Sequence, residues 1–134
     1  MFTQTSLKLT HHAILKMLEA ATACADKIGQ PQCIVIVDAS GETLGSLRMS
    51  GAKYLSLKSA RSKARTAASI GAPSNAVPVD FGPLIAAATG GDVTRLGGGL
   101  PIVINGHLVG GIGVGSGSAE QDIEVATAAI DAIS

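Results

Sequence analysis

Apolar residues recur at helical spacing in three segments of the chain, and short apolar runs lie between these segments. The first helical pattern follows Thr10, covers residues 11–28 and ends at Gly29, and further patterns cover residues 53–70 and 119–133. Residues 77–89 have a looser pattern, which predicts about one helical turn. The chain is therefore predicted to contain three main helices separated by shorter elements.

Two pairs of short apolar runs predict β-hairpins. Residues 34–37 are β-branched, and the turn sequence Asp38-Ala39-Ser40-Gly41 leads into a second strand over residues 42–49. Near the C-terminus, Asn105-Gly106 separates two apolar runs and indicates a type I′ turn, because both central residues of that turn must accept a positive φ. Hairpins linked by long helices predict the α+β class, in which helices cover an antiparallel sheet.

The C-terminal hairpin leads into a glycine cluster and then a helix. Gly113, Gly115 and Gly117 leave this stretch of backbone almost bare of side chains. Ser118 and Gln121 then have the spacing of a capping box, in which each side chain satisfies an amide at the start of the helix. We therefore expect the ligand site at this turn.

Length and composition favour a single domain over residues 1–134. A chain of this length buries enough surface to fold without disulfides, and no linker rich in Pro or Ser divides it.

Cys24 lies in a helical pattern and Cys33 in a strand pattern, and the chain has no Cys-x-x-Cys spacing. We expect both to be buried thiols of a reducing compartment.

Charge and hydropathy argue against several classes of partner. The formal net charge is zero, and one Tyr with two Phe cannot supply a stacking surface for bases, so we expect no nucleic-acid partner. No apolar run approaches the roughly twenty residues of a membrane span, and no secretory leader pattern opens the chain. We therefore expect no membrane partner and a cytoplasmic location.

Several motifs together carry a resemblance to a known family. In chain order they are Ile34-Val35-Ile36-Val37-Asp38, Arg48-Met49-Ser50-Gly51-Ala52, Lys63-Ala64-Arg65-Thr66-Ala67, Gly98-Gly99-Leu100-Pro101, Gly110-Gly111-Ile112-Gly113-Val114 and Glu120-Gln121-Asp122. From about Leu7 to its end, the chain resembles the GlcG/HbpS family in their order and spacing. The resemblance implies a profilin-like fold, a five-stranded antiparallel sheet packed with helices, and a homo-oligomer ranging from dimer to octamer.

The same resemblance carries functional expectations. It implies that some members bind or degrade haem and that others are fused to corrinoid enzymes. The chain departs from the family pattern at two places, because Ser50 stands where Asp is usual and Gly115-Ser116-Gly117 stands where Ser-Gly-Gly is usual. Ligand contacts made by those side chains are therefore not carried over.

Two charged residues project toward the apolar side of predicted helices. At about 100° per residue, Lys63 lies about 60° from the centre of the apolar stripe of the middle helix. In the last helix the apolar stripe includes Ile123, Ala126 and Ile130, and Asp122 lies about 40° from its centre. The helix dipole favours an ionised Asp122, which suits a proton acceptor.

Three interpretations of Lys63 and Asp122 stay open. Lys63 could extend to solvent while Asp122 complements the helix dipole, or the two could form a buried ion pair. Alternatively both belong to a ligand site, in which case we expect substitutions to impair binding or turnover far more than folding.

Arg48 ends a strand, where its planar donors could hold a carboxylate or a propionate.

The glycine cluster lacks the third glycine of a dinucleotide motif, and no Gly-Lys-Ser follows it. Because acidic residues follow the cluster, its amides suit a carboxylate or oxyanion oxygen better than a phosphate. We assign catalytic roles to Lys63, Asp122 and Arg48, and ligand-binding roles to Met49, Pro101, Gly113, Gly115, Gly117 and Glu120.

All three histidines are predicted to be exposed, and none has the spacing of a metal site with Asp, Glu or Cys. An exposed histidine can still ligate haem between subunits, so the resemblance makes His11 or His12 a candidate axial ligand.

The leading hypothesis is a binding protein for haem, another tetrapyrrole or a small anionic metabolite, accessory to a metabolic pathway. The alternative is a cofactor-free isomerase or lyase that acts on a small carboxylated substrate, and an oligomerisation module without ligand is a third interpretation.

Overall fold

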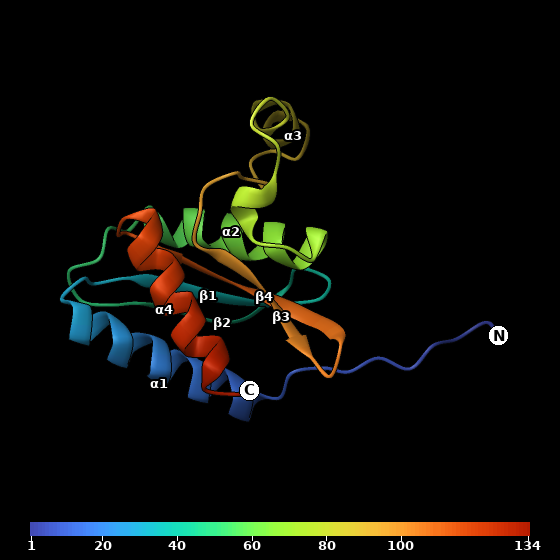
Figure 1. Cartoon of the computed structure of the whole chain (residues 1–134), viewed down its shortest axis with the longest axis horizontal. Coiled ribbons are helices and arrows are strands. Elements are labelled where there is room, and N and C mark those ends of the chain that lie inside the picture. The colour runs from blue at the N-terminus through green and yellow to red at the C-terminus, as the bar shows by residue number, and fades with distance from the viewer.

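The computed structural model describes all 134 residues and places an antiparallel sheet between two layers of helices (Figure 1). The strands are β1 (Cys33–Asp38), β2 (Thr43–Arg48), β3 (Gly99–Ile104) and β4 (His107–Gly115), in the order β2-β1-β4-β3. The helices are α1 (His11–Ile28), α2 (Ser56–Ile70), α3 (Gly82–Ala88) and α4 (Ala119–Asp131), with a 3₁₀ turn over Ser74–Ala76. The α+β class is thus confirmed.

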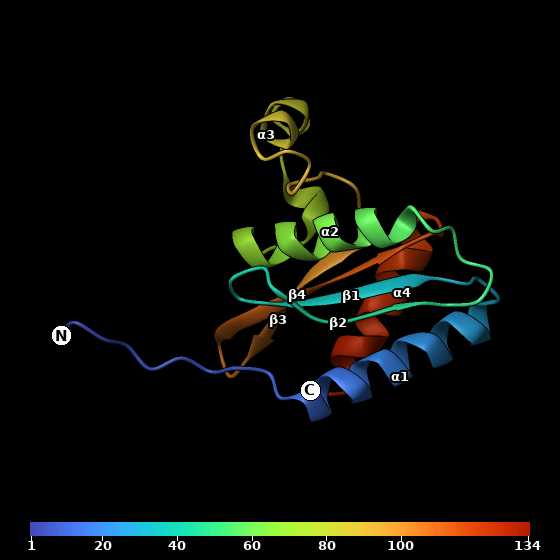
Figure 2. The same cartoon turned by 180° about the vertical axis from the view of Figure 1, so that it is seen from behind.

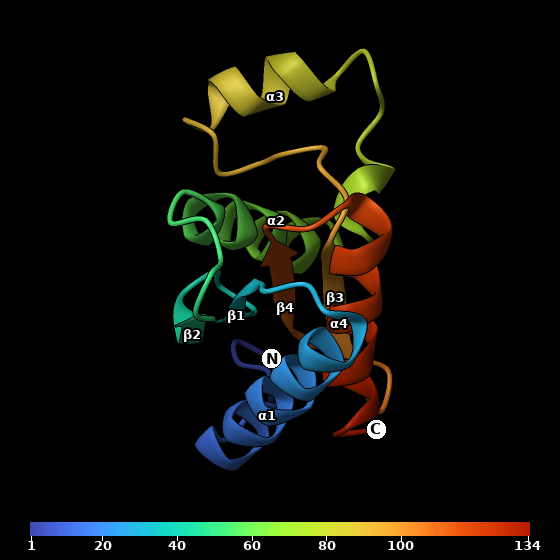
Figure 3. The same cartoon turned by 90° about the vertical axis from the view of Figure 1, so that its left-hand side faces the viewer.

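The sheet has four strands, so the expected fifth strand is wrong. Residues 1–10 have no regular secondary structure and extend away from the sheet (Figure 2). Residues 71–98 form the 3₁₀ turn, α3 and loops, which lie outside the sheet beyond α2 (Figure 3). No extended segment remains to pair with either outer strand, so β2 and β3 are the edges of the sheet.

Several element boundaries lie where local sequence signals predict them. The Thr10 side chain accepts a hydrogen bond from Ala13 N at the start of α1, and Gly29 ends the helix in the left-handed conformation. Both central residues of the β3–β4 turn have positive φ, 50° at Asn105 and 78° at Gly106. The capping box at Ser118 is present in α4. Each of these predictions is confirmed, because each depends on contacts within a few residues.

Helix α2 lies directly on the backbone of β4. Gly111, Gly113 and Gly115 point toward it, and a Cβ on Gly113 would collide with the carbonyl oxygen of Ala60. A Cβ on Gly111 would collide with that of Ala64 in the same way. Two strand residues advance about 6.7 Å and four helix residues about 6 Å, so the two repeats stay in register along the contact. We call these three glycines the glycine seam.

The opposite face of the sheet carries larger side chains. Helices α1 and α4 pack there against each other and against the sheet, and the core between them is aliphatic. Its largest fully buried members are Met17, Ile34, Ile36, Ile102, Ile112, Val114 and Val125. The α2 face therefore combines close backbone contact at β4 with small side chains packed at β1, and the opposite face is packed by larger side chains.

Helix α4 is rotated relative to the predicted stripe. Its buried residues are Asp122, Val125, Ala126 and Ala129, whereas Ile123 is only half-buried. The reason is that α4 contacts both α1 and the sheet, so its buried face lies between these two neighbours. Asp122 consequently lies within the buried face and not at its margin.

The two cysteines differ in burial. Cys33 is fully buried, but Cys24 is only half-buried, so the prediction of two buried thiols is wrong for Cys24. Burial raises the pKa of Cys24, and Glu124 adds to the increase. Burial also raises the pKa of Cys33, against the smaller lowering effect of Arg48. Raised thiol pKa values disfavour the reactive thiolate.

None of the helices combines the length and the apolar character that a membrane span requires.

We expect Gly113→Ala to destabilise the protein by about 3 kcal/mol, because the new methyl group must displace the α2 backbone from β4. Chemical denaturation measures the change in the free energy of unfolding. Gly82→Ala is the control, since a Cβ there meets Arg95 at an ordinary 3.5 Å, and it should be neutral or slightly stabilising. Equal stability of the two variants would contradict the role of the glycine seam.

Candidate functional site

Lys63 and Asp122 form an ion pair that joins the two helical layers. Lys63 lies on α2 and Asp122 on α4, and Lys63 Nζ is 3.0 Å from Asp122 Oδ2. The side chains are only 7% and 3% exposed. Lys63 Nζ also donates to the carbonyl oxygen of Val114 at 2.8 Å, so the pair is anchored to the end of β4. The interpretation in which Lys63 extends to solvent is therefore wrong, and the buried ion pair is the one of the three that the structure shows directly.

The pair passes the end of the sheet at Gly98, which precedes β3. Gly98 has a φ of 118°, and a Cβ there would lie 2.6 Å from Val114 O, 2.9 Å from Asp122 Cβ and 3.1 Å from Lys63 Nζ. Both its conformation and its surroundings require glycine. In Figure 3 the first turn of α4 reaches past the sheet to the level of α2, which allows the two side chains to meet.

The turn between β4 and α4 holds the second oxygen of Asp122. The amide of Gly117 donates to Asp122 Oδ1 at 3.1 Å. Ser116, the preceding residue, has a φ of 95°, which is unfavourable for a residue with a side chain. Its hydroxyl accepts a hydrogen bond from Lys53 N at 3.0 Å, so the turn is tied to the loop before α2.

A pocket of about 280 Å³ opens over this pair. Its wall includes residues from the starts of α2 and α4 and from the two glycine-containing segments that flank them. They are Lys53, Ser56, Ser59, Lys63, Leu96, Gly97, Ser116, Gly117, Ala119 and Asp122. We call it the α2–α4 pocket.

Lys63, Asp122 and Gly117 are the predicted site residues that line the α2–α4 pocket. Arg48 is exposed on β2, where it pairs with Cys33 of β1. Cys33 pairs on its other side with Gly115 of β4, so the Cα atoms of Arg48 and Gly115 are two strand spacings, about 10 Å, apart. Arg48 does not line the pocket. The proposed catalytic set is therefore brought together only in part.

The remaining predicted ligand contacts lie outside the pocket lining. Met49 packs against the core, and its sulfur accepts from Gln32 N at 3.4 Å. Pro101 is half-buried in β3 opposite Gly111. Glu120 is exposed on α4. These side chains lack the placement that a contact with a ligand in the α2–α4 pocket would need.

Two glycines with predicted ligand roles instead serve the packing. Gly113 lies beneath Ala60, and a Cβ on Gly115 would lie 3.1 Å from the carbonyl oxygen of Ser56. Sequence reasoning missed Lys53, Ser56 and Ser116 as pocket residues. A serine within a glycine cluster was the available signal for Ser116, but the approach of the 53–56 loop depends on the tertiary fold.

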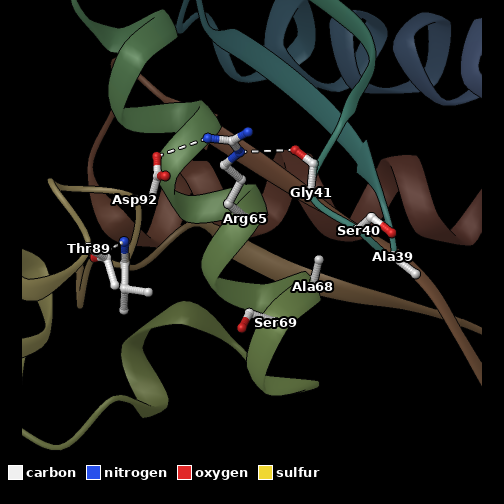
Figure 4. Close-up of a pocket in the computed structure, with 9 residues that line it drawn as sticks. Ala39, Ser40, Gly41, Arg65, Ala68, Ser69, Thr89 and Asp92 are labelled. Atoms are coloured by element: carbon white, nitrogen blue, oxygen red, sulfur yellow. Dashed lines mark hydrogen bonds and ion pairs between the residues drawn. The ribbon is translucent and has the colours of Figure 1, made fainter.

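A second pocket, of about 450 Å³, lies at the base of the segment that carries α3 (Figure 4). Arg65 dominates its wall, where Nε donates to Gly41 O at 2.9 Å and one terminal nitrogen lies 3.0 Å from Asp92. Arg65 thus connects the β1–β2 turn to the loop after α3. Because Asp92 offsets its charge, this pocket has less attraction for an anion than the α2–α4 pocket.

His11 and His12 begin α1 and are both exposed, with ring centroids 4.0 Å apart. One turn further along the helix lie Leu15, which is 64% exposed, and Lys16. His107 is exposed at the β3–β4 turn. No group of three or more His, Cys, Asp or Glu side chains could hold a metal ion.

Comparison with known proteins identifies the family. The family described as haem degrading protein HbpS-like matches residues 9–131, and the chain belongs to this family. The corrinoid adenosyltransferase PduO of Salmonella typhimurium is 32% identical over 134 residues, which is 96% of this chain. The chain spans only 40% of the length of that relative.

Solved structures agree with the family assignment. The PduOC:heme complex is 30% identical, superposes with a TM-score of 0.87, and the alignment covers 94% of this chain and 95% of that one. Klebsiella pneumoniae ORFY is 27% identical and superposes with a TM-score of 0.91, with coverage of 98% and 95%. The fold is therefore shared over nearly the whole chain.

We expect Lys63→Met and Asp122→Asn each to lower the free energy of unfolding by about 3 to 5 kcal/mol, because each leaves a buried charge without its partner. A site role without this buried pairing would leave folding nearly unaffected. The double variant should cost less than the sum of the two single variants. Urea denaturation of all three measures the coupling, and Lys58→Met, at an exposed position of α2, is the control. Strict additivity would show that the pair contributes no coupling energy.

Proposed function

We propose that this protein binds haem on the exposed face of α1. The observation that carries the proposal is the juxtaposition there of two imidazoles, an exposed leucine and a lysine: His11, His12, Leu15 and Lys16. An imidazole is a common axial ligand of haem iron, an apolar side chain suits the porphyrin face, and a lysine suits a propionate. Support comes from the relative crystallised as a haem complex, which is 30% identical to this chain.

The α2–α4 pocket, at about 280 Å³, lies below the range of about 300 to 1,000 Å³ that is usual for pockets enclosing a drug-sized ligand, so we place the haem on the surface. A single face of α1 covers only one side of such a ligand. We therefore propose that a second copy of this chain covers the other side, in agreement with the predicted homo-oligomer. Bound haem supplies a redox-active iron, while α1 supplies the nitrogen ligand and the apolar contact.

The geometry offers less support for a cofactor-free isomerase or lyase. Lys63 Nζ is held by both Val114 O and Asp122, and Arg48 lies outside the pocket. The predicted proton-transfer pair and the predicted carboxylate-binding arginine therefore do not surround one substrate position. A cytoplasmic location and an accessory metabolic role remain parts of the proposal.

Titration of the haem-free protein with haemin should produce a Soret band distinct from that of free haemin. Replacing His11 and His12 together by Ala should abolish or shift that band, because the nitrogen ligand sets the iron spectrum. His107→Ala, at an exposed histidine on another element, is the matched control and should leave the band unchanged. A wild-type protein without a band, or a double variant with an unaltered one, would contradict the proposal.

The α3 segment offers a surface for self-association. Val79, Phe81 and Leu84 are 65%, 50% and 67% exposed, and a mostly apolar hollow of about 480 Å³ lies between this segment and the end of α2. Exposed apolar clusters of this kind are typical of protein interfaces. We infer that a second copy of the chain covers it.

Static light scattering at micromolar concentration should give a mass above that of the 13.3 kDa monomer. The Phe81→Asp and Leu84→Asp double variant should shift the mass toward the monomer, because it places two charges in the apolar contact. Leu55→Asp changes an equally exposed leucine outside the α3 segment and should not affect the mass. A monomeric wild-type protein would contradict the proposed contact through the α3 segment.

A further inference from the structure

The α2–α4 pocket is rich in hydrogen-bond donors that the fold leaves unused. The Lys63 ammonium has three N–H donors and spends two of them, on Val114 O and Asp122 Oδ2. Lys63 is only 5% exposed and lines the pocket, so its third N–H can reach an acceptor only within the pocket. A buried charged donor without a partner is costly, and a ligand acceptor would remove that cost.

Other groups in the wall reinforce this preference for an acceptor. Lys53 is an exposed residue of the pocket wall and adds a positive charge there. The hydroxyl of Ser116 accepts from Lys53 N, which leaves its own proton to donate. The one carboxylate in the wall, Asp122, already accepts from Gly117 N and Lys63. Donors therefore remain unused in the wall, whereas each oxygen of its carboxylate already accepts a hydrogen bond.

The start of α4 adds amide donors. Ser118 accepts the amide of Gln121 on its hydroxyl and that of Asp122 on its carbonyl oxygen. The amides of Ala119 and Glu120 precede these and have no carbonyl within the helix to bond. Because α4 has 13 residues, its dipole also favours negative charge at this end.

A buried amide without partners lies behind Gly117, next to the pocket wall although not part of it. Gln32 is fully buried, and neither Nε2 nor Oε1 of its side chain has a hydrogen-bond partner. Its Nε2 lies 2.9 Å from the position a Cβ would take on Gly117, and Asp122 Oδ1 lies 3.0 Å from the same position. Buried polar side chains without partners are rare in proteins.

We propose that the α2–α4 pocket binds a small monocarboxylate. Lys53, Lys63 and Asp122 together give the wall a formal charge of plus one, so a single negative charge is balanced, whereas a dianion would face the Asp122 carboxylate. The volume of about 280 Å³ equals roughly nine waters in the liquid, which suits a molecule of a few carbon atoms. This site is separate from the haem surface on α1 and does not depend on it.

Propionate, its neutral isostere propionamide and inorganic phosphate are suitable probes for the haem-free protein. Propionate should shift the backbone amide signals of residues 116–120 in ¹⁵N NMR titrations and bind about tenfold more tightly than propionamide, because charge-assisted hydrogen bonds are the stronger ones. Phosphate should bind more weakly than propionate. Shifts elsewhere only, equal binding of propionamide, or tighter binding of phosphate would each overturn the proposal.

Two variants test the pocket without breaking the buried ion pair. Ser116→Gly suits the φ of 95° and should fold at least as well as the wild type, yet it removes a donor and should weaken propionate binding about threefold to tenfold. Lys53→Gln should also weaken it, whereas Lys58→Gln removes an exposed charge from α2 outside the pocket and should not. Unchanged affinity in both Ser116→Gly and Lys53→Gln would overturn the assignment.

Discussion

The contact between the backbones of α2 and β4 is the constraint on which the rest of this structure depends. The glycine seam brings the carbonyl oxygens of Ala60 and Ala64 against β4, where any side chain on Gly111 or Gly113 would collide with them. This approach sets the height of α2 above the sheet, and thereby the position of Lys63. A helix held off by ordinary side chains would not bring that ammonium to Val114 O and Asp122.

The ion pair gives the molecule a connection between its two helical layers at one end of the sheet. Gly98 leaves the space through which it passes, and the β4–α4 turn supplies the Gly117 amide to the same carboxylate. A buried pair of this kind adds little net stability relative to an apolar pair of equal volume, but it is costly to break. Its main effect here is to fix the first turn of α4 relative to the middle of α2, which shapes the donor-rich pocket.

The two proposed ligand sites lie at opposite ends of the α1–α4 layer. The histidines begin α1 near the C-terminal end of α4, whereas the pocket lies at the first turn of α4, about 20 Å away along that helix (Figure 1). The haem surface is open and depends on a covering partner, and the pocket is small and already complete within one chain. Occupation of one site therefore need not require the other.

Sequence patterns determined the features that depend on neighbouring residues. The ends of α1 at Thr10 and Gly29, the turn at Asn105-Gly106 and the capping box at Ser118 are all confirmed, because their hydrogen bonds join residues close in the chain. Helical periodicity also indicated that Lys63 and Asp122 point inward. Only the tertiary structure decided that they meet each other, that Arg48 lies apart from them, and that the sheet stops at four strands. Those outcomes depend on strand pairing and on the close approach of α2, which join residues far apart in the sequence and leave no local periodic signal.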